Sequence, residues 1–236
     1  MSADVDPSAV SESRESQAPA GAGSPPVIAA GRDRFRQTAL LVFAVALVIR
    51  LLALWAASDA ELVKDEIAYA ARANALLDGK GYLGSYQSWV KHDGWRIMDL
   101  PQYPGAYQPP GYPTFMAAIM AVSARSLVAV KLVQCLLSAL SCVLLLRLGR
   151  AWFGERAGAI AGWLWALYPN AIAFSHLLWS ETLFVFLLLA LLDLLFGVGA
   201  AKGSSSFPSL RRCSVAGVVL ALAALTRGTA VFLAPV

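Results

Sequence analysis

Long apolar runs separated by short polar segments dominate the chain after residue 37. The first run, residues 38–57, has about the 20 residues that an α-helix needs to cross the hydrocarbon of a bilayer. Further runs of this kind lie at 126–148, 157–174, 177–199 and 213–236. Because a helix satisfies its backbone hydrogen bonds internally, these runs predict an all-α, multi-pass transmembrane bundle of about five spans.

The polar start of the chain differs from the rest. Residues 1–37 are rich in Ser, Ala, Pro and charged side chains, a composition that buries too little apolar area to offset the entropy of ordering the chain. We therefore expect a disordered tail, followed by one transmembrane domain over 38–236. A cleavable signal would carry a short apolar region near the start, so the first span is predicted to stay uncleaved. The sequence stops at the end of an apolar run, which predicts a chain cut short.

Basic residues beside the apolar runs predict the orientation. Arg34 and Arg36 precede the first span. By the positive-inside rule, they place the N-terminus on the cytoplasmic side of a cell membrane. If residues 126–148 form the next span, Arg147 and Arg150 also reach the cytoplasm.

The segment between these two spans is then external. Residues 58–110 are polar and predict an ordered loop. Residues 111–124 are apolar but number only about 14, which is short for a span and typical of an interfacial or re-entrant helix. Together they form a predicted external region, 58–125, built around an amphipathic helix.

Composition agrees with a membrane protein. Hydrophobic residues make up 58% of the chain and charged residues 14%, which excludes an ordinary soluble surface. The net charge of +4 is scattered over the ends of apolar runs rather than gathered in a patch, so we expect no nucleic-acid partner. Cys135 and Cys142 lie inside one apolar run and are expected to be packed thiols.

The segment VKDEIAYAARANALLDGKGYL, residues 63–83, carries the strongest chemical signal. It predicts a helix from Asp65 to about Asp78, ended by the glycines that follow. At 100° per residue, Asp65, Glu66 and Tyr69 share one side, so an acidic pair begins the apolar face of this helix. Spacing alone favours a helix cap and a charge that complements the helix dipole over a catalytic pair.

Three segments in this order resemble the N-terminal part of GT-C glycosyltransferases, the group that includes protein O-mannosyltransferases, the aminoarabinose transferase of lipid A and Rgt-type sugar transferases. They are the acidic pair with its Ala-rich helix and Gly-x-Gly-Tyr, the PPGYP element at 109–113, and FGERAGAIAGWLWALYP at 153–169. The resemblance implies transfer of a sugar from a polyprenyl-phosphate donor to an acceptor on the outer face of the membrane. It indicates neither the sugar nor the acceptor.

The resemblance also implies roles for acidic residues. Asp65 matches the family's catalytic base or metal ligand, with Glu66 beside it as the alternative acid. Glu181, in the turn WSETL, matches a second acidic position, although a helix start explains it equally well. Tyr69 and His176 are candidate substrate-binding residues, and His176 also fits an interfacial position. The sequence does not identify a cofactor; if a divalent metal ion binds, Asp65 and Glu181 are its candidate ligands.

Charge inside an apolar run is costly and therefore a functional hypothesis. Lys131 and Arg227 are expected to contact the donor phosphate, because the family carries a basic residue near the first position and an arginine fork suits a phosphodiester. Lys131 fits snorkelling to the interface equally well. Arg50, in mid-span, fits a buried pairing as well as catalysis. Asp193 is expected to snorkel or pair near the cytoplasmic end.

Two alternatives stay open. A non-catalytic membrane protein, such as a transporter or a lipid-carrier subunit, also tolerates intramembrane Lys and Arg. The sequence shows no self-similar halves and predicts no broken helix pair, which disfavours this class. An inactive truncated remnant of a transferase is the other alternative.

Overall fold

The structure is a computed structural model of the chain. It describes residues 26–58, 61–62, 65–84, 89–91, 95–97, 103–104, 108–196 and 210–233. The predicted tail up to residue 25 and the stretch 197–209 lie outside the described residues.

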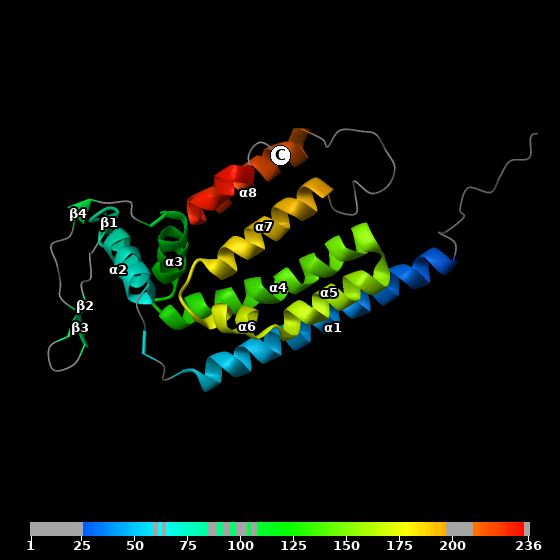
Figure 1. Cartoon of the computed structure of the whole chain (residues 1–236), viewed down its shortest axis with the longest axis horizontal. Coiled ribbons are helices and arrows are strands. Elements are labelled where there is room, and N and C mark those ends of the chain that lie inside the picture. Colours follow the sequence, from blue (N-terminus) through cyan, green and yellow to red (C-terminus); the bar gives the residue numbers. More distant parts are fainter. Residues whose placement is uncertain are drawn as a thin grey trace, which may run out of the picture.

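The fold is a helical bundle. Five helices run along its long axis (Figure 1): α1 (Pro26–Ala56), α4 (Leu127–Phe153), α5 (Glu155–Leu167), α7 (Glu181–Phe196) and α8 (Leu210–Thr226). α4 packs against α1, α5 and α7, and α8 packs against α7. The predicted helical architecture is therefore confirmed.

Fewer spans than the predicted five are supported. Asp33–Ala56 and α4 are each long and apolar enough to cross a membrane. The short helix α6 (Pro169–His176) and α7 pass that test only together, as a pair bent by 116°. The described residues thus contain two candidate spans, or three if the bent pair counts as one.

The first helix begins earlier than predicted. α1 starts at Pro26 rather than after residue 37. The fixed φ of proline suits the first position of a helix, and the Ala and Arg residues that follow favour helix over coil. Helix α1 therefore begins before the first predicted span, and the candidate span Asp33–Ala56 within it overlaps that prediction.

The predicted continuous helix over 157–174 is wrong. α5 ends at Leu167, Tyr168 has an extended backbone with φ −67° and ψ 117°, and α6 begins at Pro169. A proline has no N–H for the carbonyl four residues before it and holds the preceding residue in an extended conformation. Because α6 and α7 form a bent pair, the expectation of no broken helix pair is also wrong.

Close helix packing in the bundle depends on glycine. Gly149 of α4 faces Gly158 of α5, where an added Cβ on Gly158 would lie 2.5 Å from the carbonyl oxygen of Leu146. Gly158 and Gly162 form a G-x-x-x-G pattern, which lets two helix backbones approach. These glycines hold α5 against α4.

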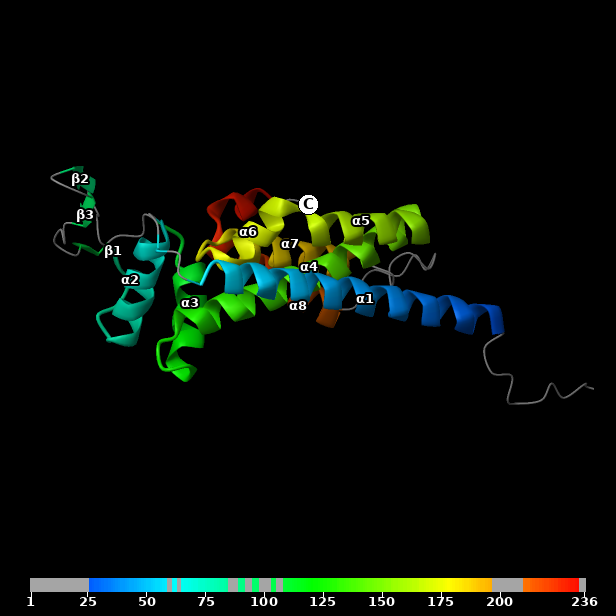
Figure 2. The ribbon, with the colours of Figure 1, turned by 90° about the horizontal axis from the view of Figure 1, so that it is seen from below.

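Two short helices cover one end of the bundle. α2 (Asp65–Leu77) and α3 (Gly111–Val122) pack together there, as Figure 2 shows. Gly79 and Gly81 have φ of +70° and +77°, which confirms the predicted end of α2. With its 12 residues, α3 confirms the short apolar helix.

The segment between α2 and α3 adds four strands of two or three residues. They pair antiparallel, β1 (Leu83–Gly84) with β4 (Tyr103–Pro104) and β2 (Trp89–Lys91) with β3 (Trp95–Ile97).

The opposite end of the bundle carries the pairing expected for Asp193. Its carboxylate lies 2.9 Å from the guanidinium of Arg147 on α4. Arg212 of α8 also donates a hydrogen bond of 3.2 Å to the main-chain carbonyl of Asp193. The prediction that Asp193 pairs there is confirmed.

Candidate active site

A polar cavity of about 260 Å³ lies where α2 meets the start of α7 and the end of α8. Four of the seven site residues predicted from the sequence line it, although they are far apart in the chain: Asp65, Tyr69, Glu181 and Arg227. The remaining walls are Pro109, Trp179, Ser180, Thr226, Gly228 and Thr229. The fold therefore brings most of the predicted site together.

Arg227 and Glu181 form an ion pair in this cavity. The Nη1 atom of Arg227 donates a hydrogen bond of 2.7 Å to the Oε1 atom of Glu181. Both side chains remain partly exposed, at 41% and 29%. A guanidinium has five N–H donors, so one contact leaves others for an oxyanion. The guanidinium of Arg227 also lies 5.8 Å from the ring centre of Phe184.

The end of α8 explains why Arg227 reaches this cavity. The predicted last run, 213–236, is divided: α8 ends at Thr226 and a 3₁₀ helix, η1 (Gly228–Leu233), follows. Arg227 stands at the junction, with its N–H bonded to the carbonyl of Ala223 at 2.9 Å. Arg227 therefore makes the last α-helical bond of α8 and lines the cavity where the chain changes helix type.

The two neighbouring acids diverge. Asp65 is exposed at the first residue of α2 and lines the cavity. Glu66 is 2% exposed and accepts a hydrogen bond of 2.7 Å from the main-chain N–H of Leu178. Successive residues of a helix point about 100° apart, so one acid faces the cavity while the other faces the core. Glu66 therefore holds the segment before α7 and does not line the cavity.

The segment between α6 and α7 is fixed by further polar side chains. The amide of Gln134, buried on α4, donates to the carbonyl of Leu177 at 2.7 Å. Thr182 donates through its hydroxyl to the carbonyl of Phe174 at 2.7 Å. Together with Glu66, these bonds satisfy the main chain at a 116° bend and set where α7 begins. Glu181 is the first residue of α7, so its position follows from them.

Tyr69 joins the cavity to the core. Its ring packs edge-on against Tyr112 of α3, with centroids 4.8 Å apart. Burial raises the pKa of Tyr69, the nearby Glu181 and Asp65 carboxylates raise it further, and the hydrogen bond with Ser180 and the charge of Arg227 oppose the rise. The phenol therefore stays protonated at neutral pH and presents a hydroxyl rather than a charge.

Two predicted substrate-binding residues lie elsewhere. Lys131 lines a separate, mostly apolar groove between the end of α1 and the start of α4, beside Trp55 and Leu132. His176 is the last residue of α6, and its Nε2 atom is buried without a hydrogen-bond partner among the described residues. Neither residue lines the cavity with Asp65.

Sequence reasoning missed Trp179. Its indole N–H is buried with no hydrogen-bond partner in the described part of the chain, and the residue lines the cavity. An indole nitrogen only donates, so it can serve an oxygen of a bound ligand. Its place in WSETL, two residues before Glu181, was the available signal.

The cavity contains two carboxylates that could act as metal ligands, Asp65 and Glu181. Over the ranges that the structure describes, no group of three or more His, Cys, Asp or Glu side chains gathers. Binding of a divalent ion by the two carboxylates stays a prediction.

Comparison with known proteins agrees with the geometry. The sequence model of the family described as dolichyl-phosphate-mannose-protein mannosyltransferase matches residues 107–236, which include α3 to α8 and two of the cavity's charged residues. No curated protein and no solved structure matches the chain. Since the match covers more than half of the sequence, the chain belongs to the dolichyl-phosphate-mannose-protein mannosyltransferase family, a family of GT-C glycosyltransferases.

Proposed function

We propose that this protein transfers a glycosyl group from a polyprenyl-phosphate donor to a hydroxyl acceptor at the cavity between α2, α7 and α8. The gathering of Asp65, Glu181 and Arg227 in one partly exposed cavity carries the proposal. A carboxylate that can take a proton and a guanidinium that can hold a phosphate are the two groups this chemistry requires. Asp65 and Arg227 are far apart in the sequence and come together only in the fold.

The reaction follows from these groups. The Asp65 carboxylate takes the proton of the acceptor hydroxyl. At the same time the acceptor oxygen bonds to the anomeric carbon of the donor sugar. The bond between that carbon and the phosphate oxygen breaks, and the polyprenyl phosphate leaves with the bonding electron pair. Arg227, whose guanidinium is partly exposed in the cavity, is the donor proposed to hold the leaving phosphate.

Glu181 has a second role in this scheme. Its carboxylate lies 2.7 Å from the Arg227 guanidinium and competes with the phosphate for it. Lys131 is left out of the scheme, because it lines a different groove.

Donor binding gives the first test. A short-chain polyprenyl phosphate, free and esterified with mannose as the family description suggests, is titrated into the purified chain in lipid nanodiscs. Arg227→Gln should weaken binding of both compounds by about tenfold or more, because charge-assisted hydrogen bonds to the phosphate are lost. Lys131→Gln, which removes a cation of the other groove, is the matched control. Absence of binding to the unaltered chain, or equal loss in both variants, contradicts the proposal.

Transfer to an acceptor gives the second test. Asp65→Asn should reduce the rate about 100-fold to 10,000-fold, the usual contribution of a general base, while donor affinity stays unchanged. The amide has nearly the shape of the carboxylate but cannot take the proton. Full activity of Asp65→Asn in a chain that binds donor would remove Asp65 from the chemistry.

We further propose that the cavity faces away from the cytoplasm. In Figure 1, α2, which begins with Asp65, lies at the bundle end opposite to the ends of α4 and α7, which carry Arg147 and Asp193. In a Cys213→Ser background, Lys80→Cys should react with a membrane-impermeant maleimide added to intact cells. Arg156→Cys should react only after the membrane is permeabilised. The reverse pattern would invert the topology.

A further inference from the structure

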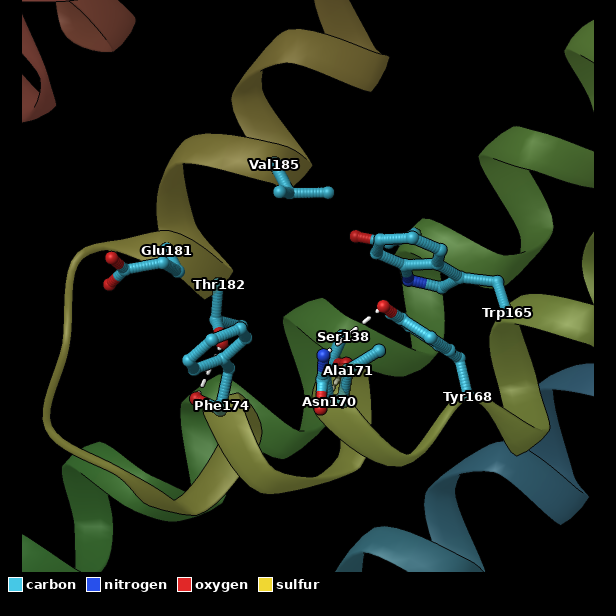
Figure 3. A pocket seen from close by; sticks show the side chains of 10 residues that line it. Ser138, Trp165, Tyr168, Asn170, Ala171, Phe174, Glu181, Thr182 and Val185 are labelled. Atoms are coloured by element: carbon cyan, nitrogen blue, oxygen red, sulfur yellow. Dashed lines mark hydrogen bonds between the residues drawn. The ribbon is translucent and has the colours of Figure 1, made fainter.

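A second cavity, of about 150 Å³, lies among α4, α5, α6 and α7, and Figure 3 shows its lining side chains. Glu181 lines both this cavity and the polar one, so the two are neighbours across a single side chain. In Figure 3 the Glu181 carboxylate is turned away from the middle of the second cavity, which agrees with its pairing to Arg227.

Aromatic rings form one side of the second cavity. Trp165, in the last turn of α5, and Tyr168, between α5 and α6, lie with ring centroids 5.7 Å apart, tilted by 32°. Figure 3 places both rings opposite Phe174 and Thr182. Such rings offer broad apolar faces on which the C–H face of a sugar ring can pack.

Neutral polar groups supply the rest of the lining. Ser141 and Thr182 donate their hydroxyl protons to main-chain carbonyls, of Leu137 at 2.9 Å and of Phe174 at 2.7 Å. Their oxygens therefore keep lone pairs that can accept hydrogen bonds.

Asn170 adds both kinds of polar group. Its amide nitrogen donates to the hydroxyl of Tyr168 at 3.1 Å, which leaves the Tyr168 proton free to be donated and the Asn170 carbonyl free to accept. Apart from Glu181, the residues of this cavity carry no charge.

Together these features describe a ligand. A cavity of about 150 Å³ admits a six-membered ring such as benzene. The lining is complementary to a ring with one apolar face and several hydroxyls. It contains no cationic side chain that could neutralise an anion. A phosphate fits the neighbouring cavity with Arg227 instead.

We infer that the second cavity is the subsite for the uncharged pyranose of the donor, with Trp165 and Tyr168 as its stacking platform. This inference rests on the proposed function. The phosphate then lies against Arg227, the sugar ring against the aromatic pair, and the anomeric carbon between them beside Glu181.

Interfacial anchoring is the other use of Trp and Tyr at the end of a membrane helix. It explains exposed rings in contact with lipid but not the neutral hydrogen-bonding groups that face the same cavity. It also predicts no effect of these residues on sugar recognition, and this difference can be measured.

The test compares free polyprenyl phosphate with its mannosyl, glucosyl and galactosyl esters in nanodiscs. The ratio of the affinity for an ester to the affinity for the free phosphate isolates the contribution of the sugar. For the best ester, Trp165→Leu should reduce this ratio by about tenfold, and Trp165→Phe should restore most of it, because it keeps an aromatic face. Trp163→Leu, two residues away on the same helix, is the matched control and should leave the ratio unchanged.

Two further variants guard against misfolding. The side chains of Tyr168 and Asn170 are exposed, so Tyr168→Phe and Asn170→Ala should fold, and each should reduce the ratio a fewfold through a lost hydrogen bond. An unaltered chain that binds the phosphate with no gain from any sugar overturns this inference alone. So does an undiminished ratio in the Trp165→Leu, Tyr168→Phe and Asn170→Ala variants. Failure to bind either the free phosphate or its esters overturns the proposed function as well.

Discussion

Arg50 on α1 donates a hydrogen bond of 2.7 Å from Nε to the Oγ atom of Ser138 on α4, in the middle of the bundle. Its other nitrogens donate to the carbonyls of Ala166 at 3.2 Å and Trp165 at 3.3 Å, which end α5. The negative end of the α5 dipole thus meets a fully buried cation, at the point where Pro169 offers no N–H to the carbonyl of Trp165, which receives a 3.4 Å bond from the N–H of Tyr168 besides that of Arg50. Arg50 therefore has a structural role, since it binds the carbonyls at the break between α5 and α6.

Replacing this arginine should destabilise the bundle. Arg50→Met removes the guanidinium donors to the carbonyls of Ala166 and Trp165 and should lower the free energy of unfolding by about 2–3 kcal/mol. Ser138→Ala removes one of the bonds and should cost about 1 kcal/mol. Unfolding in mixed micelles measures both. Ser214→Ala, at an exposed hydroxyl of α8, is the control. Equal stability of Arg50→Met and the unaltered chain would show that the carbonyls find other donors.

The sequence predicted those elements whose ends and lengths are determined by residues close together in the chain. The glycines after Asp78 ended α2 as expected, and the short apolar run became α3. Pro169 carried the signal for the break between α5 and α6, but the apolar composition around it favoured one continuous span. Length and composition therefore predicted more spans than the described residues support.

The candidate site was predicted in part, for a physical reason. Asp65, Glu181 and Arg227 each had local motif support, and the fold places them in one cavity. Their mutual arrangement depends on a 116° bend that no local pattern encodes. Lys131 shared the same type of signal and lies in another groove, because the direction of a side chain depends on how α1 packs on α4.

Gly158 should not tolerate a side chain. An added Cβ would lie 2.5 Å from the carbonyl oxygen of Leu146 and 2.6 Å from the main-chain nitrogen of Arg150, so α5 must move away from α4. Gly158→Ala should lower the free energy of unfolding by about 1–3 kcal/mol. Gly217→Ala is the matched control: its Cβ meets no atom within 4 Å, and alanine should stabilise α8 by about 0.5–1 kcal/mol. Unfolding of both variants in mixed micelles measures these changes. A loss of unfolding free energy of the same size in both would contradict the packing argument.

The adjacent acids should separate stability from catalysis. Glu66→Ala leaves the buried N–H of Leu178 without its acceptor and should cost about 1–3 kcal/mol of unfolding free energy. Glu66→Gln keeps an acceptor oxygen and should lose less. Asp65→Asn should leave stability unchanged, because Asp65 is exposed. Thermal unfolding of the three variants distinguishes them, and a large loss in Asp65→Asn would assign it to the fold.

Asp78 should titrate below the ordinary range of an aspartate. The hydrogen bond from Arg125, 2.8 Å long, lowers the pKa of Asp78, with smaller contributions from the charge of Arg125 and from Lys80. Because the folded pKa is depressed, the stability contributed by the bridge between Asp78, just after α2, and Arg125, just after α3, is present above the unfolded pKa and is lost as pH falls through the folded pKa. Carbon-13 NMR of labelled aspartate should show the Asp78 pKa rising in Arg125→Gln. An unchanged pKa would show that the bridge is absent in solution.

Glu181 and Arg227 should affect phosphate binding in opposite directions. Arg227 is the proposed phosphate ligand, and Glu181 competes for the same guanidinium through their 2.7 Å ion pair. Glu181→Gln frees the guanidinium and should tighten binding of free polyprenyl phosphate by up to about fivefold, since a partly exposed ion pair contributes at most about 1 kcal/mol. Arg227→Gln should weaken it by about tenfold or more. In the double variant the gain from Glu181→Gln should vanish, because no guanidinium remains to be freed. Titration of all four chains completes the cycle. If Glu181→Gln tightens binding equally in both backgrounds, its charge acts on the phosphate directly rather than through Arg227. If it weakens binding, Glu181 positions Arg227 more than it competes for it, and transfer activity should fall with affinity.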